Sequence, residues 1–119
     1  MLIFSILFLQ PNIHALEERS HIVNAKEILT AIEKGENIYL DNTSIEGTLN
    51  LSDLNLPTRK ADQSELITYL GYPATKVVKS SIHIKNSIVN GSIYFNDASF
   101  DNIINFDNIK FNGNTDFSR

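Results

Sequence analysis

Apolar residues recur every eleven positions along most of this chain, a period that neither a helix nor a single strand explains. From Ile38 the chain divides into rows of eleven in which the first, third and eighth columns are apolar. The fourth and fifth columns are mostly Asp, Asn or Ser, and three rows carry Gly in the tenth. The rows are IYLDNTSIEGT (38–48), LNLSDLNLPTR (49–59), IHIKNSIVNGS (82–92), IYFNDASFDNI (93–103), INFDNIKFNGN (104–114) and the partial row TDFSR.

A row this short cannot bury its own apolar side chains, so the rows must stack and turn each apolar column into a ladder. Neighbouring strands then lie about 4.8 Å apart. We expect the first, third and eighth columns to face inward and the fourth and fifth to face outward. Asn and Asp suit the corners because they cap turns, and Gly suits them because it accepts positive φ. The pattern favours a β-helical solenoid over a meander of hairpins, which needs turn signals between strands of period two.

One amphipathic helix is predicted before the rows, within a capping region at 16–36. In NAKEILTAIEKG, Asn24 is the expected N-cap, Glu27 completes a capping box and Gly35 ends the helix. Its apolar face should cover the first row, as the end of a stack of repeats requires. The preceding LEERSHIV either extends the helix or forms a separate turn.

The rows are interrupted at 60–81, whose length is two rows. Its third-column positions are Asp62 and Pro73, which cannot continue an apolar ladder. We expect a projecting loop there, with a short helix in its first half. Such insertions often carry binding, but a long loop is also tolerated without any role.

Several segments share a five-residue motif centred on an apolar residue. ASFDN (98–102) has the small residue and the central Phe, INFDN and IKFNG keep the Phe, and LNLSDLNL is centred on leucine. On these segments the chain resembles the pentapeptide-repeat family, in a divergent form that alternates steps of five and six. The resemblance implies a right-handed quadrilateral β-helix at 37–119, mainly β, with a capping helix at one end. Two rows of eleven would make one coil.

The first residues have the features of a targeting segment. MLIFSILFLQPNIHA (1–15) contains no charge, has a short apolar core and ends on the small residue Ala15. The core is too short to cross a bilayer. We expect a signal peptide and export to the exterior or cell surface. The alternative is an apolar strand or helix docked on a cytoplasmic domain.

Composition and candidate chemistry narrow the function classes. The 119 residues suit one domain, the absence of Cys excludes disulfides, and the net charge of −4 argues against a nucleic-acid groove. The histidines are His14, His21 and His83, and His83 falls in an outward column without a partner His or Cys. We therefore predict no catalytic, cofactor-binding or metal-binding residues. Stacked Asx columns could bind calcium, but turn capping explains them better.

The pattern favours a non-enzymatic, exported structural or protein-interaction scaffold whose partner is a protein or an envelope polymer. The alternative is a small β-helical enzyme acting on polysaccharides, which needs clustered charges. The candidates are dispersed over several columns: Asp97, Asp101, Asp107, Asp116, Lys85, Lys110 and Arg119. Some members of the resembled family mimic DNA and bind topoisomerases, but this repeat is richer in Asn than in carboxylates.

The last rows carry Phe111 and Phe117 with only Ser118 and Arg119 after them. A stack of repeats needs a polar cap where it ends. We therefore expect the solenoid either to be truncated here and to continue in a longer protein, or to form an end-to-end homodimer through this last row.

Overall fold

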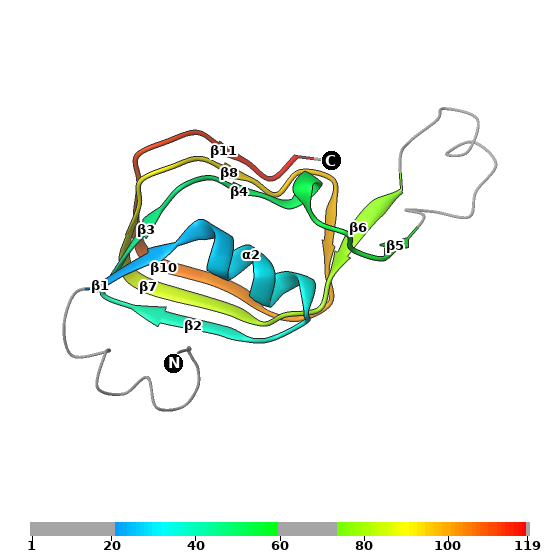
Figure 1. The fold of residues 1–119 in the computed structure, drawn as a ribbon, viewed down its shortest axis with the longest axis horizontal. Helices are drawn as coiled ribbons and strands as arrows, with labels where there is room; N and C mark the ends of the chain where they lie inside the picture. Colours follow the sequence, from blue (N-terminus) through cyan, green and yellow to red (C-terminus); the bar gives the residue numbers. More distant parts are fainter. Residues whose placement is uncertain (1–20, 60–73, 119) are drawn as a thin grey trace.

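The described part of the chain is mainly β, with parallel sheets and one α-helix (Figure 1). A computed structural model describes residues 21–59 and 74–118. The largest sheet contains β1 (His21–Asn24), β2 (Ile38–Asp41), β3 (Thr43–Glu46), β7 (Ile82–Val89) and β10 (Ile104–Phe111). A second contains β4 (Leu49–Asn50), β8 (Ile93–Tyr94) and β11 (Thr115–Asp116). The third contains β5 (Thr58–Arg59), β6 (Thr75–Val78) and β9 (Ala98–Phe100), and its β5–β6 pair is antiparallel.

The predicted helix is present as α2, Ala25–Glu33, with the predicted ends. The Asn24 side chain accepts a hydrogen bond from the N–H of Lys26, and Glu27 accepts one from the N–H of Asn24. At the other end Gly35 has a φ of 76° and donates to the carbonyl of Ile32. Both caps therefore satisfy backbone groups that a helix end leaves unpaired.

The buried face of α2 joins the core of the first row, as expected. Ala25, Ile28 and Ile32 belong to the same buried cluster as Ile38 and Leu49. Figure 1 shows α2 between the strands β2, β7 and β10 on one side and β4, β8 and β11 on the other. The helix thus packs over one end of the stacked rows.

The segment before α2 is neither helix nor turn within the described residues. His21–Asn24 forms β1, which pairs in parallel with β3 and places Val23 opposite Ile45. The row pattern therefore extends further towards the N-terminus than Ile38. Only four residues carry it there, which is too few for a period of eleven to be recognised. The predicted signal peptide at 1–15 lies outside the described residues.

The strands stack in the predicted register. Ile82 faces Ile38 on one side and Ile104 on the other, so members of one column face each other. Successive stacked partners in β7 and β10 are 22 residues apart, which is two rows of eleven. Ile82, Ile84 and Val89 are almost fully buried, whereas Lys85 and Asn86 of the fourth and fifth columns are exposed. The inward and outward assignments of these columns are therefore confirmed.

The sixth column also faces inward, which the column analysis did not predict. Thr43, Ser87 and Ala98 are buried. The Thr43 N–H donates to Ser87 Oγ at 3.0 Å, and that hydroxyl donates to the Lys85 carbonyl at 2.7 Å. Small polar residues can occupy this column because their hydrogen-bonding groups are satisfied within the stack.

The predicted bounds of the interruption, 60–81, are wrong at the C-terminal end, because the regular strands resume before residue 81. Thr75–Val78 forms β6, which pairs in parallel with β9 and sets Val78 opposite Phe100. Val77, Val78 and Ser80 are buried. The second half of the row at 71–81 thus keeps the register of the columns. Residues 60–73 lie outside the described part, so the short helix predicted there stays a prediction.

The corners use two different devices. Among the described residues, four non-glycine residues have positive φ, and all lie in the fifth column: Asn42, Asn86, Asp97 and Asn108. These residue types accept the left-handed conformation at a turn. In the tenth column only Gly47 has positive φ, so the expected reason for glycine is wrong for Gly91 and Gly113. A Cβ on Gly91 would lie 2.0 Å from the carbonyl oxygen of Gly47, which requires glycine for close backbone approach.

Replacing Gly91 by Ala should therefore destabilise the fold by about 3 kcal/mol or more, because the methyl group overlaps a backbone atom that cannot move alone. The matched control is Gly35→Ala, where a Cβ meets nothing within 4 Å. It should cost about 1–2 kcal/mol for the left-handed backbone alone. Equilibrium urea unfolding of both variants measures the difference, and equal costs would refute the stacking of glycine on glycine.

Candidate functional site

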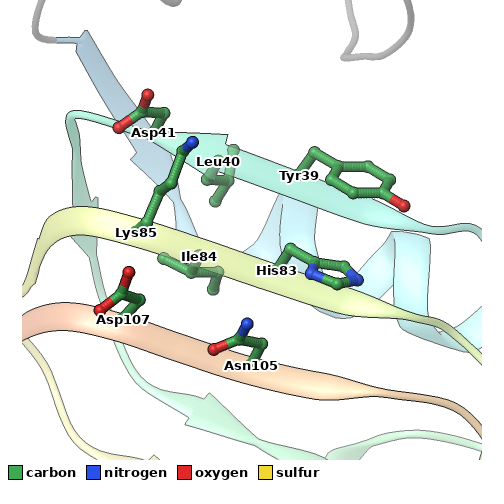
Figure 2. Close-up of a pocket in the computed structure, with 8 residues that line it drawn as sticks. All are labelled: Tyr39, Leu40, Asp41, His83, Ile84, Lys85, Asn105 and Asp107. Carbon is green, nitrogen blue, oxygen red and sulfur yellow. The ribbon is translucent and has the colours of Figure 1, made fainter.

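The outer face of the sheet formed by β2, β7 and β10 carries a tyrosine, a histidine, a lysine and two aspartates. Because side chains alternate along a strand, the second and fourth columns both face outward here. Figure 2 shows two lines of side chains that cross the three strands. The first cross-strand line is Tyr39, His83 and Asn105, and the second is Asp41, Lys85 and Asp107.

A depression with a volume of 490 Å³ lies on this face. Its lining residues are Tyr39, Leu40, Asp41, His83, Ile84, Lys85, Asn105 and Asp107. The polar lining residues come from the two cross-strand lines, while Leu40 and Ile84 belong to the apolar third column. The site is thus a surface of the regular sheet, built from stacked strands.

His83 occupies the outward position expected for it, between the buried Ile82 and Ile84. Its ring stacks on Tyr39 with the ring centroids 4.8 Å apart and the planes inclined by 6°. The centroid distance equals the spacing of neighbouring strands, so the backbone ladder itself sets the stack. His83 is half-buried as a result, and Tyr39 remains 60% exposed. Sequence reasoning placed His83 in an outward column without a partner His or Cys and missed this contact.

Charges alternate along the second cross-strand line, with Lys85 between Asp41 and Asp107. This order avoids placing like charges directly opposite each other across neighbouring strands. Within 21–59 and 74–118, no group of three or more His, Cys, Asp or Glu residues could hold a metal ion. The arrangement presents hydrogen-bonding groups and alternating charge on the outer face of the sheet.

One ladder of side-chain amides adjoins the site and a second follows the ends of β7 and β10, and sequence reasoning found neither. Asn108 Nδ2 donates to Asn86 Oδ1 at 2.8 Å, and Asn86 Nδ2 donates to Asp41 Oδ1 at 3.0 Å. Asn112 Nδ2 likewise donates to Asn90 Oδ1 at 2.8 Å. Asn pairs at a separation of 22 were visible in the sequence, but the direction of their amides was not.

The remaining acidic residues named above do not gather at this face. Asp101 forms an ion pair with Arg59 at 2.9 Å, and the hydrogen bond from Arg59 lowers the pKa of Asp101. Hydrogen bonds from Ser118 lower the pKa of Asp116, whose carboxylate caps the backbone N–H of that residue. Asp97 occupies a corner with positive φ. The structure therefore assigns these carboxylates to turns and an ion pair.

Comparison with family models, with curated proteins and with solved structures finds no match to this chain. Among the residues that the structure describes, no helix has the length and apolar character needed to cross a membrane. Function must therefore be argued from the surface itself.

The amide ladder can be tested by replacing Asn86 with Asp. The carboxylate keeps the shape of the amide but loses the donor to Asp41 and faces a second carboxylate, so stability at pH 7 should fall by about 1 kcal/mol. Chemical unfolding measures the loss.

The matched control is Asn105→Asp, which adds the same charge on the neighbouring strand β10. The Asn105 side chain makes no hydrogen bond with another described residue, so this change should cost no more than about 0.5 kcal/mol. Similar losses in both variants would mean that the ladder contributes nothing.

Proposed function

We propose that this chain is a non-enzymatic scaffold built as a right-handed β-helical solenoid of the pentapeptide-repeat type, which presents its outer sheet face to a protein or an envelope polymer. The solenoid is supported by the 22-residue register and by columns that face themselves across the strands. The non-enzymatic role is supported by the dispersal of the carboxylates over turns, an ion pair and an outer face.

The observation that carries the binding role is the pair of cross-strand lines of side chains on β2, β7 and β10 (Figure 2). Tyr39 and His83 offer planar rings held at the strand spacing, and the second cross-strand line offers alternating charge. Side chains fixed by a sheet lose little conformational freedom on binding, which favours affinity. An extended partner could contact several strands at once.

The proposal also places the protein outside the cytoplasm, on the basis of the apolar segment at 1–15. The scaffold would then act at the cell surface or in the surrounding medium. No nucleic acid is proposed as a partner, because the net charge is negative.

The binding face can be tested by site-specific photo-crosslinking in the source cells. A benzoylphenylalanine at position 39 keeps an aromatic ring on the proposed face. It should give a discrete adduct, with protein or with polymer. The adduct should weaken when His83 is replaced by Ala, because the ring then loses its support.

The matched control places the same photoreactive residue at position 94. Tyr94 lies in the same column but on β8, in the second sheet. Adducts that form equally from both positions, or from neither, would refute the assignment of this face.

Export can be tested by mass spectrometry of the protein recovered from the cell exterior. The mature chain should begin at Leu16, after the small residue Ala15. Ala15→Lys should block this cleavage because a large charged residue replaces the small one. Recovery of the wild-type chain only from the cytoplasm, beginning at Met1, would overturn the proposal of export.

A further inference from the structure

Within 21–59 and 74–118, the outer edge of β10 is left without a paired strand, and an apolar surface lies beside it. β10 ends the strand order of its sheet, and among the described residues no strand pairs with its outer edge. Phe111 is 38% and Phe117 is 44% exposed, whereas the aligned Val89 is almost fully buried. An edge of this kind is a template for another strand.

We propose that a second copy of this chain pairs with this edge, with the two β10 strands antiparallel about a two-fold axis. The axis passes close to Asn108 and Ile109, so that Phe106 lies opposite Phe111 of the partner subunit. Asp107 then lies opposite Lys110 of the partner subunit, and the symmetry repeats each pair. The inference does not depend on what binds the outer face.

The backbone groups at the edge suit this pairing. The Ile82 N–H donates to the Ile103 carbonyl of the next row, so the equivalent N–H groups of Ile104 and Phe106 point to the free edge. The Val89 carbonyl accepts from the Asn112 N–H, so the equivalent carbonyl of Phe111 points there too. Antiparallel strands exchange hydrogen bonds between alternate opposite residues, as Phe106 and Phe111 would do here.

The bend of β10 fits a two-fold arrangement. Asn108 has a φ of 55° and turns the strand, so residues 104–107 and 109–111 lie on two sides of a corner. A two-fold axis through that corner exchanges the two sides. Residues 104–107 of one copy therefore meet 109–111 of the other, which is the self-complementary contact that a symmetric dimer requires.

Side-chain chemistry selects the register. In the proposed register Asp107 and Lys110 form two opposite-charge pairs on the outside. On the inside, Phe106 already contacts Phe111 and Phe117 of its own chain at centroid distances of 6.0 and 6.1 Å. Sliding the strands to the next antiparallel register would put Asn105 opposite Lys110 and leave Asp107 opposite Asn108. That register loses both charge pairs.

The test is a charge-swap experiment on the full chain by sedimentation velocity over a wide concentration range. The wild type should dimerise. Asp107→Lys and Lys110→Asp should each weaken dimerisation about tenfold or more, because both opposite-charge pairs become like-charge pairs. An equimolar mixture of the two variants should recover the dimer, since each Lys then faces an Asp.

Both residues are exposed, so circular dichroism should show unchanged folding. The matched control Lys26→Asp makes the same charge change on the exposed side of α2, at the other end of the stack, and should dimerise as the wild type does. A monomeric wild type, single variants that dimerise normally, or a mixture that stays monomeric would each overturn the proposal.

Discussion

The stacking of each row on another row of the same pattern is the constraint on which the rest of this structure depends. The stacked partners lie 22 residues apart, or 44 where the interruption lies between them. No row is long enough to bury its own Ile, Leu or Phe, so burial exists only between rows. Once the rows are in register, the backbone has little freedom at the corners. Positive φ at the fifth column and the absence of a Cβ at Gly91 are both consequences of that register.

The same register orders the outside of the molecule. When backbones stack at the strand spacing, side chains of one outward column must also stack, whether they attract or repel. Tyr39 on His83, Asn108 on Asn86 and Lys85 between two carboxylates are the combinations that profit from this proximity. The candidate site is therefore an extension of the core's regularity to the surface. A partner would encounter a fixed lattice of groups, which favours recognition of an extended molecule over a small one.

The sequence allowed much of the fold to be predicted because its main signal is periodic. The inward columns and the helix caps follow from positions that can be counted, whereas the two-row offset was implied by the resemblance to pentapeptide repeats. The sixth column was missed because Thr43 and Ser87 resemble surface residues until their hydrogen bonds within the stack are seen. β1 and β6 were missed because each preserves only part of a row. The site was harder still, since ring stacking and amide direction depend on geometry that residue types alone do not specify.

The two ends of the stack differ, and this difference limits how copies could assemble. At one end α2 packs over the first row and buries Ala25, Ile28 and Ile32 in the core, so a head-to-tail partner would have to displace a helix that is capped at both ends. Continued parallel stacking in that manner would also generate an open filament, because nothing closes the series. Two copies that meet through β10 avoid both problems, since each covers the edge that the other leaves free. Such a pair must run antiparallel, so the charges of Asp107 and Lys110 fall on opposite strands and can select the register. The parallel order within each chain and the antiparallel contact between chains are thus compatible parts of one assembly.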